Sequence, residues 1–194
     1  MTTTPFTFPT TFNQVTVHDD ITGYDSISWI NLPAIAGTDS YTQTSQTLYT
    51  MSGFWQERFL SSTNQIWLTG FNFPDNGRTV LGIEFQLHIL RSARIEDYVI
   101  QLTKDGSTLI GNNYASTVNP VQSDTYTADI TIPQNPVGDY NIYGGPADLW
   151  GTTWTSTDIA SPNFGIAISF HSNQIYPHRD TAYVNQVALR ITYA

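Results

Sequence analysis

Cysteine is absent from this sequence of 194 residues, and lysine occurs once, as Lys104. Without cysteine the chain forms no disulfide and offers no thiolate ligand, so packing, hydrogen bonds or oligomerisation must stabilise it. The formal net charge of −9 is opposite in sign to the surface that neutralises phosphate groups. We therefore expect neither nucleic acid nor an anionic membrane as a partner.

Long apolar segments are absent too. No stretch contains the about 18 consecutive apolar residues that suggest a transmembrane helix. The first residues, Met1–Pro5, lack the basic start and apolar run of a secretory signal peptide. We therefore expect a protein that does not span a membrane and is not exported by the general secretory route.

Aromatic residues are plentiful, at 13% of the chain, whereas charged residues make up only 12%. This length suits one domain, and the aromatic content supplies enough apolar surface for a sizeable core. Abundant threonine, serine and asparagine favour strands and turns over helices. The composition therefore predicts one all-β domain.

Strict alternation of apolar and polar residues marks the clearest strands. From Val80 to Leu90 the apolar side chains fall on one face and Glu84 and His88 on the other. We expect Glu84 to face solvent, and His88 to lie at the surface or beside a cross-strand polar partner. The last strand shows the same pattern, with Leu189 on its apolar face. Further apolar runs at 65–73, 98–102 and 164–170 predict additional strands.

Two turn signals lie between these strands. Residues 74–78 (Pro-Asp-Asn-Gly-Arg) predict a hairpin between the strands at 65–73 and 80–90, and residues 104–107 (Lys-Asp-Gly-Ser) predict a second hairpin. A short helical turn is expected within 147–159, capped by Thr155 or Ser156. Together these signals predict an antiparallel two-sheet sandwich, either jelly-roll or immunoglobulin-like.

The first twelve residues differ from the rest, because Pro5 and Pro9 disfavour continuous strand pairing. We interpret residues 1–12 as an extended N-terminal arm and residues 13–194 as a single sandwich domain. The arm carries three phenylalanines that would be costly to leave in water, so docking on a neighbouring subunit is favoured over a loose terminus. These candidate partner-binding residues are Phe6, Phe8 and Phe12.

Residue patterns that indicate catalysis or metal binding are missing. The four histidines show no H-x-H or H-E-x-x-H spacing, and there is no G-x-S-x-G nucleophile turn and no phosphate-binding glycine loop. Asp19-Asp20 or Asp75-Asn76 could contribute to a calcium site, but turn conformation explains the same composition. We therefore predict no catalytic residues, no metal and no cofactor.

A dense aromatic segment at 140–154 is the strongest remaining candidate for function. Flat aromatic rings beside polar groups stack on sugars and also anchor protein interfaces. The same residues could instead close one end of the sandwich, with the neighbouring glycines allowing tight turns. The candidate partner-binding residues here are Tyr143, Trp150 and Trp154.

This segment also carries a resemblance. Residues 143–151 (Tyr-Gly-Gly-Pro-Ala-Asp-Leu-Trp-Gly), Trp154, residues 158–159 and 161–168, and the closing residues 184–193 form a series that resembles β-sandwich domains in structural proteins of tailed phages, including cyanophages. Asn72-Phe73, Gly82-Ile83 and the turn at Asp105-Gly106 fit the same layout. The resemblance covers about Gln65 to Tyr193, and Asn185 departs from it where an aspartate is expected.

The resemblance implies a virion component without catalytic residues. We expect a capsid cement or decoration protein that binds and stabilises neighbouring capsid subunits, because the aromatic arm suits a protein that reaches across to neighbours. A tail, fibre or baseplate component, or a glycan- or receptor-binding module, is the alternative. The expected partners are the major capsid protein or other virion subunits. We also expect the chain to form a homo-oligomer, a trimer, that assembles in the host cytoplasm.

Overall fold

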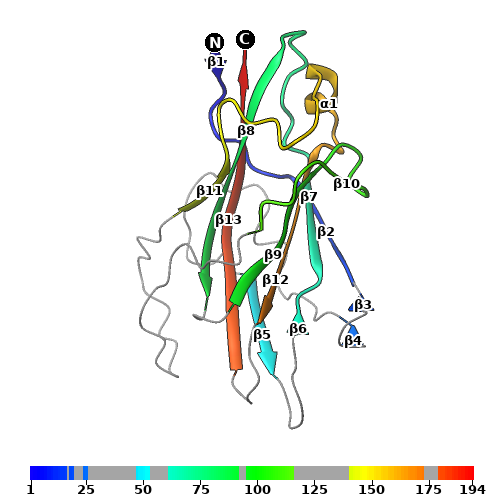
Figure 1. Ribbon diagram of the computed structural model, residues 1–194, viewed down its shortest axis with the longest axis vertical. Coiled ribbons are helices and arrows are strands. Elements are labelled where there is room, and N and C mark those ends of the chain that lie inside the picture. Colours follow the sequence, from blue (N-terminus) through cyan, green and yellow to red (C-terminus); the bar gives the residue numbers. More distant parts are fainter. Residues whose placement is uncertain are drawn as a thin grey trace.

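The computed structural model describes residues 1–16, 18–19, 24–25, 47–52, 61–91, 95–115, 140–172 and 179–194, and most of them form strands (Figure 1). The elements are β1 (Thr2–Thr3), β2 (Thr11–Val15), β3 (His18–Asp19), β4 (Tyr24–Asp25), β5 (Thr47–Ser52), β6 (Ser61–Ser62), β7 (Gln65–Thr69), β8 (Val80–Arg91), β9 (Ile95–Thr103), β10 (Leu109–Ile110), β11 (Tyr140–Gly144), α1 (Ser156–Ala160), β12 (Gly165–Ser172) and β13 (Arg179–Tyr193).

These strands form two antiparallel sheets that face each other. Sheet A is five-stranded, in the order β1-β13-β8-β11, with β5 also paired to β13. Sheet B is six-stranded, in the order β10-β9-β12-β7-β2, with β6 also paired to β12. The small pair β3-β4 stands apart from both. The prediction of an all-β, two-sheet antiparallel sandwich is confirmed.

The connectivity of the sheets is that of a jelly roll. From β5 onward, β5, β8, β11 and β13 lie in sheet A, whereas β7, β9, β10 and β12 lie in sheet B. The chain therefore changes sheet at almost every connection, and the final strand lies between β5 and β8. Interleaved crossovers of this kind define the double Greek key of a jelly roll. They distinguish the fold from the immunoglobulin-like alternative.

One of the two predicted hairpins is wrong. β7 pairs in sheet B and β8 in sheet A, so residues 70–79 connect the two sheets instead of closing a hairpin. The turn itself forms as expected, since the Asp75 carboxylate accepts the N–H of Gly77 and the Asn76 side chain accepts the N–H of Arg78. Turn chemistry reverses the chain, but it does not determine which sheet the next strand joins.

The second predicted hairpin is confirmed. β9 and β10 pair antiparallel, with Leu109 opposite Thr103. In the turn between them the Asp105 carboxylate accepts the backbone N–H groups of Ser107 and Thr108, at 2.8 and 2.7 Å, and these bonds hold the pKa of Asp105 well below its usual range. The predicted helical turn is also present as α1, with Thr155 as its N-cap.

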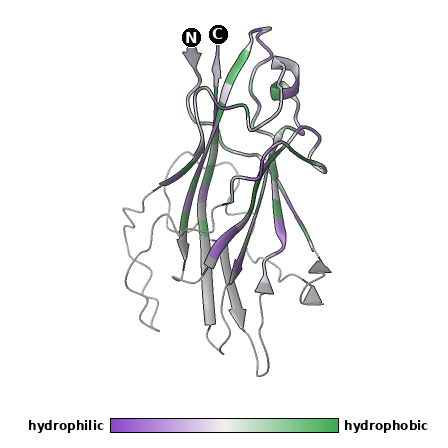
Figure 2. Cartoon of the chain, viewed as in Figure 1, coloured by the Kyte–Doolittle hydropathy of each residue, from purple (hydrophilic) through white to green (hydrophobic). Residues whose placement is uncertain are grey.

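The space between the sheets is filled with apolar side chains. The predicted inward face of β8 is buried, and so is that of β13, where Leu189 is 0% exposed. Figure 2 shows the alternation as green and purple segments along the strands of both sheets. The largest fully buried side chains of this core are Trp150, Tyr193, Phe71, Phe85, Phe164 and Phe170.

Two polar residues on the outward face of β8 are buried, contrary to the expectation that Glu84 faces solvent. Glu84 is 5% exposed, and Arg190 on β13 binds its carboxylate through two charge-assisted hydrogen bonds of 2.7 and 2.6 Å. His88 is only 1% exposed. Alternation identifies the outward face of a strand, but it does not reveal what covers that face.

Burial of His88 predicts a loss of stability in acid. Desolvation lowers the pKa of His88 from its ordinary value of 6.5, so the unfolded chain binds a proton more readily than the folded chain. The contribution of neutral His88 to the free energy of unfolding is therefore fully present above pH 6.5 and is lost as the pH falls below that value. When the pH is lowered from about 7.5 to about 5, we expect the melting temperature of His88→Gln to fall less than that of the parent. Equal losses in the two proteins would contradict this assignment.

The N-terminal segment does not extend away from its own chain. β1 pairs with the end of β13, and the N–H of Thr4 donates to Ile191 O at 2.9 Å. Further along, Thr7 and Leu189 exchange two backbone hydrogen bonds of 2.7 and 2.9 Å. We call residues 1–10 the N-terminal strap. It is extended, as predicted, but it lies along the edge of sheet A.

The strap then crosses to the other sheet. Pro9 is buried at the crossing, the N–H of Thr10 donates to Thr69 O at 3.2 Å, and β2 continues along β7. The predicted boundary between residues 12 and 13 therefore falls within β2. Because proline has no N–H, Pro5 and Pro9 interrupt the pairing without preventing it at Thr4, Thr7 and Thr10.

Candidate functional site

The aromatic segment predicted to bind a partner closes the end of the sandwich near both termini. Trp150 is 0% exposed, and its indole N–H donates to Ile83 O at 2.9 Å. Its backbone is held at a φ of 58 by the Asp148 carboxylate, which accepts the N–H of Trp150 at 2.8 Å. A buried tryptophan in the left-handed region is tolerated only where surrounding contacts fix it.

Further polar contacts hold this end together. The Tyr114 hydroxyl donates to the Asp148 carboxylate. Burial raises the pKa of Tyr114 most, and the hydrogen bond to Asp148 raises it further. Trp154 is 7% exposed and packs edge-on against Phe164, and the Lys104 ammonium lies 5.1 Å from the Trp154 ring centre. These contacts explain why the segment is ordered as part of the core.

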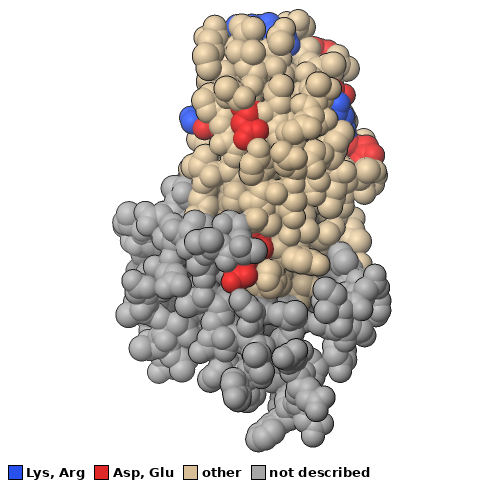
Figure 3. All heavy atoms as spheres, viewed as in Figure 1, with Lys and Arg blue, Asp and Glu red and all other residues tan. Residues whose placement is uncertain are grey.

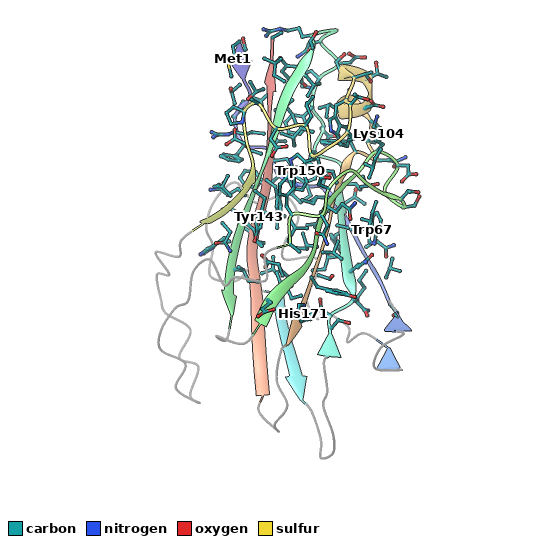
Figure 4. All side chains as sticks on the ribbon, viewed as in Figure 1. Met1, Trp67, Lys104, Tyr143, Trp150 and His171 are labelled. Atoms are coloured by element: carbon teal, nitrogen blue, oxygen red, sulfur yellow. The ribbon has the colours of Figure 1, made fainter. Side chains whose placement is uncertain are left out.

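Tyr143 links the two sheets. Its ring stacks on Phe85 in sheet A, and its hydroxyl donates to the buried Asp97 carboxylate of sheet B at 2.8 Å. In Figure 4 the labelled Tyr143 and Trp150 lie between the strands of the two sheets. The prediction that Tyr143, Trp150 and Trp154 bind a partner is therefore corrected: they are buried in their own domain, and a sugar or protein cannot dock directly on them.

The phenylalanines of the N-terminal segment are half-buried. Phe6 lies on the outer face of sheet A, with the Arg190 guanidinium 4.5 Å from its ring centre. Phe12 packs against the core from β2, and Phe8 lies between these two at the crossing. Of the six predicted site residues, these three are half-buried and the other three are buried.

A surface feature that the sequence did not indicate lies on β9. Tyr98 is 45% exposed, the highest exposed fraction among the aromatic residues whose side chains the structure describes. Pairing between β9 and β12 is irregular here, because Val99 pairs with Ser169 but Asp97 pairs with Phe170. Tyr98 is thus the extra residue of a β-bulge, a device that redirects side chains next to binding sites.

Two charged or polar side chains lie beside Tyr98. His171 packs edge-on against the Tyr98 ring at 5.3 Å between ring centres, and its Nε2 atom lies 3.3 Å from Glu96 Oε2. Both partners retain some exposure, at 21% and 18% of their side chains. We call Tyr98, Glu96 and His171 the bulge cluster. Only the register of the sheets brings it together, so sequence spacing gave no signal.

Ser62 extends this row, since it pairs with His171 on the opposite side of β12. Serine, histidine and glutamate in a row resemble the components of a nucleophilic triad. Within the described residues, however, His171 Nδ1 has no hydrogen-bond partner, so no bond from Ser62 activates the serine as a triad requires. The row has the residue types of a triad without its geometry.

Charge and metal-binding groups are sparse in the part that the structure describes. On the face shown in Figure 3, acidic and basic residues lie in small separate groups on an otherwise uncharged surface. The described residues contain no group of three or more histidine, aspartate or glutamate side chains placed to hold a metal ion. No helix among them has the length and apolar character needed to cross a bilayer.

Neither a protein-family model, nor a curated protein, nor a solved structure matches this chain. Its function therefore has to be inferred from the arrangement of its own residues. Two surfaces remain as candidates: the N-terminal strap with its half-buried Phe6, and the bulge cluster on sheet B.

Proposed function

We propose that this chain is a non-enzymatic structural protein of a phage virion, a decoration protein that binds and stabilises neighbouring capsid subunits. The observation that carries this proposal is the jelly-roll connectivity, since jelly rolls recur in viral capsid proteins, lectins and cupins. The resemblance of residues 65–193 to structural domains of tailed phages supports the same proposal.

The interior of the sandwich leaves no space for a ligand between the two sheets in the part that the structure describes. Apolar side chains from both sheets fill it, and the aromatic segment at 143–154 closes one end. Binding to a partner would therefore take place on the outer surface. The expected partners are the major capsid protein or other virion subunits. The chain itself is expected to form a homo-oligomer that assembles in the host cytoplasm.

Immunogold electron microscopy tests the proposal directly. Antibodies raised against the purified chain would be applied to particles purified from the source of the gene, with pre-immune serum as the control. Regular labelling of the capsid shell is expected. Labelling confined to tails would support a tail, fibre or baseplate component instead, and particles without label would contradict a virion role.

The bulge cluster favours a second candidate function, glycan binding. An exposed aromatic ring can stack on the apolar face of a sugar. A carboxylate and an imidazole beside the ring can form hydrogen bonds with the hydroxyl groups of that sugar. Tyr98, Glu96 and His171 supply this combination, with 45% of Tyr98 exposed. A decoration protein that carried such a site could also attach a particle to a surface polysaccharide.

Replacing Tyr98 tests the glycan candidate. On an array of bacterial surface polysaccharides, the parent protein is expected to bind a subset, and Tyr98→Ala is expected to lose that binding because the stacking surface is gone. Ile142→Ala, at a residue 49% exposed on the other sheet, is the matched control and should bind like the parent. Binding unaffected by Tyr98→Ala would contradict a site at the bulge cluster.

A further inference from the structure

The strap is attached to its own sandwich by bonds that any identical chain could offer. Thr2 and Thr3 pair with Tyr193 and Thr192, and the next contacts follow the same edge of β13. All of these bonds join residues far apart in the sequence, and they end where Pro9 is buried at the crossing. The strap before Pro9 can therefore be detached without breaking any other pairing.

Residues 1–5 contribute little apolar burial, whereas Phe6 is half-buried against Arg190. Met1 is 78% exposed, and Thr2, Thr3 and Pro5 are also exposed. Segments with few buried contacts are the first to open in folded proteins. Loss of the strap leaves a free strand edge on β13, and such an edge favours pairing with another chain.

The site that receives the strap is already built by other residues. Glu84 holds the Arg190 guanidinium through two hydrogen bonds, and Phe6 lies over that guanidinium. The receiving surface thus combines a strand edge with a fixed cation that accepts an aromatic ring. A segment with an aromatic residue at this register fits the receiving surface. The strap of a second copy is such a segment, because it has the same sequence.

We propose that residues 1–7 of the strap are exchanged between two copies of this chain, so that this part of the strap of one copy pairs with β13 of the other. The backbone at residues 8–9 is the hinge, because Pro9 remains fixed in its own sandwich. Exchange replaces each intramolecular contact with an identical intermolecular one, which makes it a low-cost route to a closed dimer. The N and C termini lie side by side at one end of the molecule, where a second copy can approach (Figure 1).

Disulfide trapping tests the exchange, because the natural chain has no cysteine to interfere. Thr3 and Thr192 are directly paired, with their hydroxyl oxygens 3.1 Å apart. Directly opposed residues of an antiparallel pair lie about 4.5–5.5 Å apart between Cα atoms, within the range of a disulfide. Thr3→Cys and Thr192→Cys would be made as separate variants, checked for parental melting temperature, mixed and oxidised.

The expected result is a disulfide-linked heterodimer of the two variants, because only exchange brings these positions together between different chains. Thr3→Cys mixed with Thr108→Cys, an exposed turn position, is the matched control for random collision. Heterodimer no more abundant than in this control would overturn the proposal. A double variant that forms only an intramolecular disulfide would overturn it too. Neither outcome depends on the chain being a virion protein.

Discussion

Replacing Leu189 by aspartate is expected to unfold the domain at ordinary temperatures. Leu189 is 0% exposed on the inner face of β13, and its backbone is paired on both sides, with Phe85 and with Thr7. An aspartate here would place a carboxylate among apolar side chains with no positive partner, and changes of this kind exceed about 4 kcal/mol. Circular dichroism during thermal unfolding would measure the loss.

Ile142→Asp is the matched control for this prediction. It makes a similar substitution at a position 49% exposed on β11, and we expect a change within about 0.5 kcal/mol of the parent. Similar stabilities for Leu189→Asp and the parent would show that β13 does not present this face to the core.

Replacing Trp150 by alanine is expected to cost about 3–5 kcal/mol, because a fully buried large side chain leaves a cavity. It also removes the indole donor to Ile83 O and leaves alanine in the left-handed conformation that Trp150 adopts, with a φ of 58. For a domain of this size the melting temperature should fall by roughly 10 °C. Differential scanning calorimetry would measure the shift.

Tyr98→Ala is the comparison for this second prediction. It removes another large aromatic side chain, but one that is 45% exposed, and its melting temperature should remain close to that of the parent. If Trp150→Ala and Tyr98→Ala melted alike, Trp150 would not be part of the core as the structure has it.

Much of the fold could be predicted from alternation and turn chemistry. The inward face of β8 and that of β13 were correctly identified, as were the β9–β10 hairpin and the N-cap of α1. These features depend on residues close together in sequence. The sheet that each strand joins depends on pairing over long distances, which explains why the turn at 74–78 was taken for a hairpin.

The candidate site could be predicted less well, for a related reason. Aromatic residues at 143–154 have the composition of a binding surface, but Trp150 and Tyr143 find hydrogen-bond acceptors at Ile83 and Asp97 and are buried. The bulge at Tyr98 is a property of the register between β9 and β12. Nothing in the local sequence marks it, because a bulge requires both strands to be known.

The central position of β13 in sheet A affects when the protein can fold during its synthesis. β13 follows the other described strands in the sequence, yet it bridges β8 to both β1 and β5. As a chain leaves the ribosome, β8 emerges well before β13, so the apolar face of β8 has no main partner until β13 has been synthesised. Folds dominated by such distant contacts also form slowly. A chain released early by a nonsense codon before Arg179 would lack that partner. Translation errors of this kind should therefore yield products that do not fold and are degraded.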